Sequence, residues 1–387
     1  MKRWFLIVLA GWACLAQALI IYNNGLDDDA YYETPAGLPQ GMGDLWGSVV
    51  FLASGNWLDA SGVYLGNGYF LTAKHVTALN PGTGQTHVYV NRVPYALDLQ
   101  FGTGGMLDVG AIPGVGQPVD LRLCRVLSPP ALPAATLNRN SAADVSAAPA
   151  YAVGCGIGKG APIPGQGWAW GEYPTCARRW GAVNIVGQTT VEIKEPALYV
   201  SSCLTSAFST AYGADVANGA MGDSGSGMFQ QIGGAWVLSG ITEAVSTMDS
   251  CSYGDNTFYV RIAHYADAIL SATTDITAGG VTVPGLWLRT HYPSAPFDSY
   301  ADLIAQTAAN GVNTVAECYV AGLNPTGAAS CFRASIVFSN GAPHIAWSPD
   351  LGDARAYHVQ GKANLAEPAW GATNNATRFF KVSVELD

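Results

Sequence analysis

Charged side chains are scarce in this sequence. Asp, Glu, Lys and Arg make up 12% of the 387 residues, against about 25% in typical soluble domains. The balance is acidic, with 18 basic and 28 acidic residues and a formal net charge of −10. No basic stripe of the kind that binds nucleic acid or an anionic membrane is present in the sequence, so both classes of partner are excluded. Low charge with abundant Gly, Ser, Thr and Tyr favours a β-rich extracellular protein.

Long hydrophobic runs are also lacking, apart from one at the start. Lys2 and Arg3 precede an apolar run, and Ala16-Gln17-Ala18 supplies small residues for cleavage after Ala18. The run is shorter than the roughly 20 residues that span a bilayer, which disfavours a membrane anchor, and Gly11 disfavours a lipoprotein signal at Cys14. Residues 1–18 therefore predict a secretory signal peptide. We expect a protein without a transmembrane span that is extracellular, periplasmic or at the cell surface.

Metal-binding patterns are missing as well. There is no CxxC pair and no Cys/His cluster, so we expect neither a metal nor a cofactor. Export permits disulfides, and the odd number of cysteines after residue 18 leaves at least one without a partner within the chain. Cys318 and Cys331, 13 residues apart, are the first pair expected. Cys124, in DLRLCRV, is expected to fill apolar space.

The rest of the chain divides by pattern. Residues 19–44 are polar and turn-rich, and we expect a leader with little structure of its own. From residue 45, short β-type runs are separated by Gly, Asn and Pro, which is typical of an antiparallel barrel or sandwich. A helical pattern, AHYADAILSA, closes this region at residue 272. Residues 273–300 are expected to be a linker, and residues 301–387 a smaller domain with a helix-turn segment and a β-rich tail.

One stretch, MGDSGSGMF at residues 221–229, could present a nucleophile. Ser224 needs a base, and His75 in LTAKHV can take and return its proton. Asp120, which opens the alternating strand VDLRL, can fix the tautomer of His75. Asp108 in GMLDVGAI is the alternative carboxylate. The surrounding glycines allow a sharp turn, so that the N–H groups of Gly222 and Ser224 converge on an oxyanion.

These three motifs, in this order and at these spacings, resemble the trypsin/chymotrypsin-like serine proteases over residues 45–272. The resemblance implies an all-β fold, a double six-stranded antiparallel β-barrel with a C-terminal helix. It also implies a triad of His75, Asp120 and Ser224 and an oxyanion hole at Gly222 and Ser224. The predicted function is a secreted serine endopeptidase acting on a protein or peptide through an acyl-enzyme. The alternatives are an inactive binding or adhesion protein on the same fold, and a serine esterase.

The sequence departs from the family at its start. No R-I-V-G-G type of new N-terminus occurs near residue 45. If the mature chain begins at Leu19, we expect that Asp223 cannot pair with the terminal ammonium and that Arg178 or Arg179 replaces it. This departure from the family predicts a bacterial-type enzyme that is active without zymogen cleavage.

The resemblance also assigns the substrate pocket. Asn218 lies at its floor, where an Asp would select Arg or Lys, and Glu243-Ala244-Val245 forms its wall, with Val245 where a Gly leaves the pocket open. Glu243 could face the pocket or could instead bond to serine or backbone groups. We expect small or apolar P1 residues.

In the C-terminal module, the stretch AANGVNTVAECYVAGLNPTGAASCF at residues 308–332 resembles bacterial secreted-protein segments related to thrombospondin type 3-like calcium repeats. Only Asn313 and Glu317 remain as plausible oxygen donors, whereas Ca²⁺ prefers six to eight oxygens, so we expect a metal-free structural turn. The β-rich tail resembles surface-associated sandwiches, which implies association with the cell surface.

Overall fold

The chain forms two units in the computed structural model, residues 1–269 and 270–387. The structure describes residues 19–26, 29–54, 60–76, 79, 84–144, 149–172, 176–194, 198–339, 342–362, 369–372 and 379–386. The expected signal peptide, residues 1–18, lies outside them. The boundary between the units falls inside helix α2 (Ala266–Thr273), close to the expected end of the first domain at residue 272.

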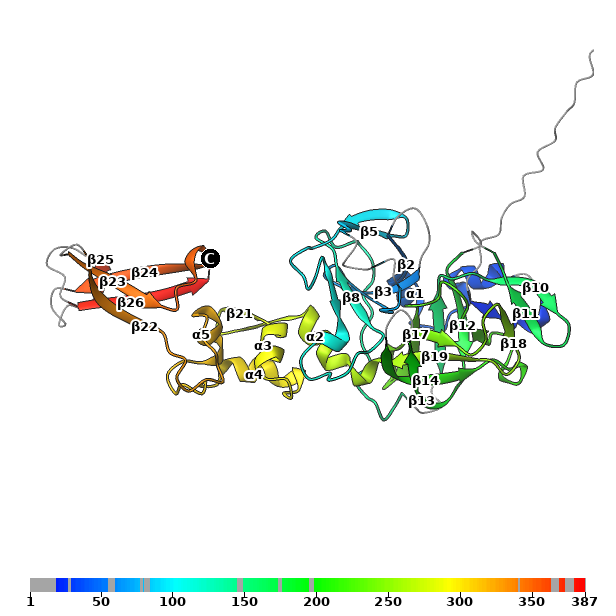
Figure 1. The fold of residues 1–387 in the computed structure, drawn as a ribbon. Coiled ribbons are helices and arrows are strands. Elements are labelled where there is room, and N and C mark those ends of the chain that lie inside the picture. Colours follow the sequence, from blue (N-terminus) through cyan, green and yellow to red (C-terminus); the bar gives the residue numbers. More distant parts are fainter. Residues whose placement is uncertain are drawn as a thin grey trace, which may run out of the picture. The chain divides into compact units, whose positions relative to one another are not determined.

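The first sheet of unit 1 closes into a barrel (Figure 1). Its strand order is β6-β5-β2-β3-β4-β8-β7. The strands are β2 (Val49–Ala53), β3 (Ala60–Gly66), β4 (Tyr69–Thr72), β5 (His87–Val90), β6 (Val93–Ala96), β7 (Met106–Asp108) and β8 (Arg122–Arg125). A bridge between Leu97 and Val126 joins the end of β6 to the end of β8. Six strands therefore form the ring, and β7 is added beside β8.

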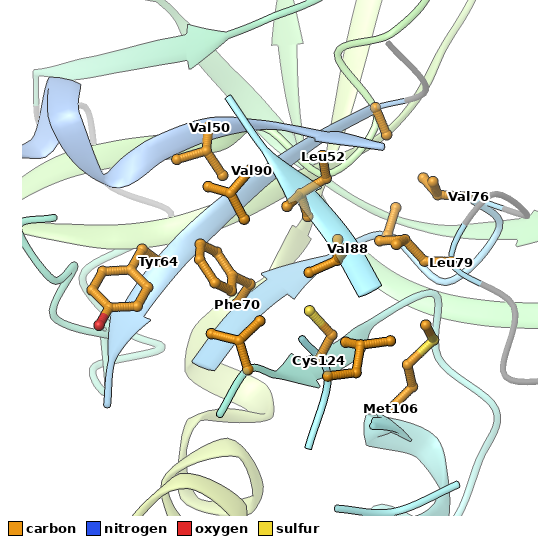
Figure 2. Packing of buried hydrophobic residues seen from close by; sticks show 14 residues of the cluster. Val50, Leu52, Tyr64, Phe70, Val76, Leu79, Val88, Val90, Met106 and Cys124 are labelled. Atoms are coloured by element: carbon orange, nitrogen blue, oxygen red, sulfur yellow. The ribbon is translucent and has the colours of Figure 1, made fainter. Parts of the chain in front are cut away.

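Apolar side chains from alternate strand positions fill this barrel, because successive residues of a strand point to opposite faces. Figure 2 shows Val50 and Leu52 of β2, Phe70 of β4 and Val88 of β5 pointing toward one another. Cys124 lies among them and is fully buried, as predicted for an apolar filler. Burial raises the pKa of its thiol to about 12.

The second sheet closes through a bent strand. Its order is β12-β9-β16-β17-β19-β14-β13. The strands are β9 (Ala150–Gly154), β12 (Arg179–Val183), β13 (Ile185–Ile193), β14 (Tyr199–Ala207), β16 (Gly227–Ile232), β17 (Ala235–Val245) and β19 (Asn256–Arg261). Only Asn184 separates β12 from β13, and this continuous length of chain pairs with β9 at one end and with β14 at the other. The all-β double barrel expected from the sequence is thus the observed fold of unit 1.

Smaller elements complete unit 1. β1 (Ile20–Ile21) pairs with β15 (Ala217–Asn218), and β10 (Lys159–Ile163), β11 (Gly167–Trp170) and β18 (Ser250–Ser252) form a three-stranded sheet. The helix α1 (Gly43–Ser48) leads into β2. The β16–β17 hairpin turns at Gly233 and Gly234, whose φ angles of 62° and 85° favour glycine.

The prediction for residues 19–44 is wrong. This segment packs onto the protein: Ile20 and Ile21 are fully buried, and Tyr32 and Met42 are 2% and 0% exposed. Asp29 is buried in an ion pair with Lys159, at 2.8 Å between Oδ1 and Nζ. The apolar residues of this segment have no regular spacing in the sequence, because the segment is held by isolated tertiary contacts rather than by one amphipathic face.

Breaking this buried pair is expected to destabilise the protein strongly. Lys159→Met leaves the Asp29 carboxyl buried without its cation, which costs about 3–5 kcal/mol of unfolding free energy. Arg139→Met is the matched control, because its pair with Asp267 is more than a third exposed on both side chains and is worth under about 1 kcal/mol. Chemical denaturation measures both. Equal losses in the two variants would contradict the prediction.

Unit 2 begins with elements where a linker was expected. Residues 273–300 include β20 (Asp275–Ala278), β21 (Val281–Pro284) and α3 (Gly285–His291). Val283 and Leu288 are fully buried in a core shared with Tyr300 and Ile304, so the linker prediction is wrong. The remaining α-helices and strands of the unit are α4 (Tyr300–Ala305), α5 (Val315–Val320), β22 (Arg333–Ser339), β23 (Ala342–Ser348), β24 (Arg355–Lys362), β25 (Gly371–Ala372) and β26 (Phe379–Leu386).

The remaining expectations concern disulfide bonds, the role of Glu317 and membrane-spanning helices. All seven cysteines in the described part of the chain are free thiols, so the predicted bond between Cys318 and Cys331 is not formed. Glu317 accepts a hydrogen bond from the Thr314 N–H and caps α5. None of the described helices has the length and apolar character needed to cross a membrane.

Candidate active site

The pairing of β4 with β8 brings two candidate residues together. These strands are antiparallel, with Thr72 opposite Arg122, so the chain leaving β4 passes the chain entering β8. His75 follows β4 by three residues and Asp120 precedes β8 by two. Ser224 comes from the second barrel, in the turn before β16. The site therefore needs both barrels.

The three side chains form one continuous hydrogen-bonded row. His75 Nδ1 lies 2.5 Å from Asp120 Oδ2, and His75 Nε2 lies 2.8 Å from Ser224 Oγ. The main-chain N–H of His75 also donates to Asp120 Oδ1 at 2.7 Å. Asp120 is fully buried, whereas 22% of the His75 side chain is exposed. This is the geometry in which a histidine can take a proton from a serine hydroxyl.

Opposing effects act on the imidazole. Burial disfavours the charged ring, but the hydrogen bond and charge of Asp120, together with the charge of Glu243, outweigh it and raise the pKa of His75 above its usual 6.5. A raised pKa stabilises the imidazolium that forms when the ring accepts a proton. The ring is therefore suited to act as a base and then as an acid.

Asp108, the alternative carboxylate, lies elsewhere. Its Oδ2 is 2.9 Å from Lys74 Nζ and its Oδ1 is 2.7 Å from Arg122 Nε. Burial would raise the pKa of Asp108, but the hydrogen bonds from Arg122 and Lys74 lower it. Of the two carboxylates, the structure places Asp120 against His75.

The turn that carries Ser224 is held from two sides. Ser61 Oγ donates to the Gly222 carbonyl at 2.9 Å, and the Gly225 N–H donates to the Thr242 carbonyl at 2.9 Å. Gly225 has a φ of 86°, and a Cβ there would collide with the Ser61 carbonyl oxygen, so only glycine fits. Within the described chain, no hydrogen bond from the Gly222 or Ser224 N–H is found, which leaves both N–H groups available to an oxyanion.

Asp223, between those two residues, is fully buried and anchors the turn. Its carboxylate accepts hydrogen bonds from the N–H groups of Gly156 and Ala220, at 2.8 and 2.9 Å, and from the main-chain nitrogen of Leu19. Burial raises the pKa of Asp223 to about 7, although these bonds and the charge of Arg179 lower it.

The sequence predicts that Asp223 of a chain beginning at Leu19 needs a partner other than the terminal ammonium, whereas the structure brings the main-chain nitrogen of Leu19 to this carboxylate. Leu19 is 1% exposed, and the pairing of Ile20 with Asn218 holds its nitrogen at the carboxylate. The prediction of an arginine partner is partly right. Arg179 acts on Asp223 through its charge and pairs with Glu33 at 2.5 Å, whereas Arg178 donates to Asn91.

The residues assigned to the substrate pocket separate into two groups. Asn218 is 1% exposed and accepts a hydrogen bond from Thr257 Oγ1 at 2.7 Å. Val245 pairs with Thr257 across β17 and β19. A Cβ on Gly219 would lie 3.2 Å from both Thr257 Cγ2 and Val245 Cγ1. Two β-branched side chains thus approach the chain between Asn218 and Ser224.

Glu243 does not belong to this group. It is 3% exposed, and its Oε1 and Oε2 accept hydrogen bonds from Ser201 Oγ at 2.7 Å and Cys203 Sγ at 2.8 Å. Of the two orientations considered for Glu243, the structure has the one that bonds to serine.

Sequence reasoning missed several contributors. Thr257 lies on β19 and Ser201 on β14, but their partners come from other strands and have no local signal. Leu19 could have been found, because it directly follows the expected cleavage site after Ala18.

The comparisons with known proteins agree with this arrangement. A family model described as trypsin matches residues 42–269, which is more than half of the 387 residues and includes His75, Asp120 and Ser224. No curated protein matches the chain significantly. In the described residues, no group of three or more His, Cys, Asp and Glu side chains is placed to hold a metal ion.

Proposed function

The chain belongs to the trypsin family, and from this membership and the site we propose that it is a secreted serine endopeptidase. One observation carries the proposal: Ser224 Oγ, His75 and Asp120 form a row with distances of 2.8 and 2.5 Å. A serine becomes a nucleophile at neutral pH when a base is within hydrogen-bond reach and a third group orients that base.

Acylation follows from the positions of these groups. Ser224 Oγ attacks the carbonyl carbon of the scissile peptide bond while its proton passes to His75 Nε2. The carbonyl oxygen becomes an oxyanion, and the N–H groups of Gly222 and Ser224 stabilise it. The C–N bond then breaks, the leaving amine takes the proton from His75, and the acyl group remains on Ser224.

Deacylation repeats the proton transfers with water. His75 Nε2 takes a proton from a water molecule, whose oxygen attacks the acyl carbon. The second oxyanion is held by the same N–H groups, and the ester bond breaks as His75 returns the proton to Ser224 Oγ. Asp120 stays ionised and stabilises the imidazolium in both halves of the reaction.

A fluorophosphonate probe tests the proposal directly. We expect the chain from Leu19 to Asp387 to be labelled, and neither Ser224→Ala nor His75→Ala to be labelled. Folded wild-type protein that is not labelled would favour the inactive binding protein. Turnover of an ester together with failure to cleave the matched amide would favour the esterase.

The substrate class follows from the side chains near Ser224. Val245 and Thr257 occupy space beside Gly219, and Asn218 is neutral, so small or apolar P1 residues are proposed.

Val245→Gly is expected to admit larger P1 residues. Removing the isopropyl group should raise kcat/KM for a Phe or Leu substrate, relative to an Ala substrate, by at least about 10-fold, since a methylene in an apolar pocket is worth about 1–3 kcal/mol. Val186→Gly is the matched control, because Val186 is 50% exposed on β13. Cleavage by the wild type chiefly after Arg or Lys would contradict the assignment.

Export is part of the same proposal. Cleavage of the signal after Ala18 would give a secreted chain that begins Leu-Ile-Ile-Tyr-Asn, which N-terminal sequencing of the secreted protein tests. Fractionation of cells that express the full chain tests the association of the C-terminal domain with the cell surface.

A further inference from the structure

A second buried carboxyl group lies behind the proposed triad. Glu243 is on β17, at a point where the register of this strand against β19 shifts between Thr242 and Ala244. Such a bulge redirects a side chain, and bulges occur often beside active sites. The bulge turns Glu243 inward, where it is 3% exposed. The reaction steps derived above do not use it.

A hydrogen-bonded path connects Glu243 to His75. Ser201 Oγ donates to Glu243 Oε1 at 2.7 Å and accepts from the main-chain N–H of Asp120 at 3.2 Å. The Asp120 carboxylate in turn accepts from both the ring and the main chain of His75. Ser201 is fully buried, so water does not compete for this path.

We propose that Glu243 is a positioning residue of this site, which fixes Asp120 through Ser201 and sets the proton affinity of His75. The proposal rests on the proposed function and adds to it a group that tunes the base. Two neighbouring carboxyl groups in a buried site are not readily ionised together. Asp120 is paired with His75, so Glu243 is the group that takes up a proton.

The surroundings of Glu243 are consistent with this role. Burial, together with the charge of Asp120, raises the pKa of Glu243 to about 7, although hydrogen bonds from Cys203 and Ser201 and the charge of His75 lower it. Burial raises the pKa of the Cys203 thiol, so Cys203 remains a donor. Burial raises the pKa of the Tyr265 phenol, and the charges of Cys203 and Glu243 raise it as well.

Three other charged groups, Arg122, Asp108 and Lys74, lie around Tyr199 near Asp120. Burial and the charges of Asp120 and Asp108 raise the pKa of the Tyr199 phenol, whereas the charge of Arg122 lowers it. Lys74 Nζ lies 4.8 Å from the centre of the Tyr199 ring. Arg122 and Lys74 are paired with Asp108. Glu243 is therefore the group on the β17 side of the triad whose charge changes near neutral pH.

The sign of the effect follows from the charges. Ionised Glu243 stabilises the imidazolium and raises the pKa of His75. As the pH falls, Glu243 becomes neutral, this support is lost, and His75 resists protonation. The two protons therefore compete, and His75 should titrate over a wider pH range than a single group.

The test is an NMR titration of His75 in the chain from Leu19 to Asp387, assigned by comparison with His75→Ala. Glu243→Gln keeps the shape and the acceptor for Ser201 but cannot ionise. We expect the pH midpoint of the His75 titration to fall by at least about half a unit, where one unit is 1.36 kcal/mol of interaction. The titration curve should also narrow to that of a single proton. The acid limb of kcat/KM should move to lower pH by the same amount.

Two further variants make the result decisive. Glu192→Gln, the same change at an exposed position of β13, should leave the midpoint of His75 unchanged. Ser201→Ala breaks the path but keeps the charge, so kcat should fall about 10-fold, as expected for a loss of about 1.4 kcal/mol, while the broad titration remains. An unchanged midpoint in folded Glu243→Gln overturns the proposal. A shifted midpoint in a chain that cleaves no peptide supports it and refutes the proposed function alone.

Discussion

Asp120→Asn is expected to lower kcat/KM for a peptide substrate by about 10⁴-fold while the fold is retained. In the native site, the His75 ring donates from Nδ1 to Asp120 Oδ2 at 2.5 Å, which leaves Nε2 free to accept the Ser224 proton at 2.8 Å. An amide NH₂ facing Nδ1 reverses this arrangement. The ring proton then resides on Nε2, and the histidine can no longer act as a base toward the serine.

Asp108→Asn is the matched control for this result. Asp108 pairs with Lys74 and Arg122 and is 30% exposed, so the same change of charge and shape should alter kcat/KM by less than about 3-fold, within the range of surface pairs. Initial rates with a chromogenic peptide that has Ala at P1 measure both variants. A larger loss in Asp108→Asn than in Asp120→Asn would reverse the assignment of the carboxylate.

This assignment shows how much of the site the sequence could predict. Ser224 lies in a glycine-rich turn, and His75 and Asp120 lie beside strands with clear apolar runs, so each residue has a local signal. The double barrel is also recoverable, because the strands are short, regularly spaced and broken by Gly, Asn and Pro. Antiparallel pairing of neighbouring strands then places His75 beside Asp120.

The parts of the structure that the sequence did not predict have a different physical origin. Residues 19–44 are fixed by isolated buried contacts, such as Tyr32 with Asp215 at 2.8 Å and Asp29 with Lys159, which lie far apart in sequence and have no periodicity. In residues 273–300, two short strands turn at Gly279 and Gly280, both with positive φ. A Gly-Gly pair predicts a hairpin turn. The two strands that it joins have only four residues each, so the alternation of their side chains is short. Glu243 depends on a bulge, which no alternation of side chains reveals.

Retaining Ala18 at the start of the mature chain is expected to lower kcat/KM at pH 8 by about 10²- to 10⁴-fold, because an unpaired buried charge costs about 3–5 kcal/mol and 1.36 kcal/mol is tenfold in rate. The main-chain nitrogen of Leu19 donates to Asp223. Under the proposed cleavage after Ala18, this amide would become an ammonium. With Ala18 retained, the fully buried Asp223 lacks that charge, and the turn that carries the Gly222 and Ser224 N–H groups loses its anchor.

The pH dependence gives the sign of this effect. Without the ammonium, burial raises the pKa of Asp223 to about 7, well above the value near 3.9 in an unfolded chain. The folded state then holds an extra proton, so stability is lost as the pH rises toward 7. With the ammonium, the carboxylate is ionised and paired. The ratio of kcat/KM between the two forms should therefore be small near pH 5.5 and should grow above pH 7.

A double-mutant cycle separates this ion pair from a general effect of the extra residue. In Asp223→Asn there is no charge to pair, so retaining Ala18 should change kcat/KM little. Equal rates at pH 8 for wild-type chains with and without Ala18, each confirmed by mass, would contradict the prediction. If the loss occurs only when Asp223 is present, the nitrogen freed by signal cleavage is the group that completes the oxyanion turn, and export and activation are a single step.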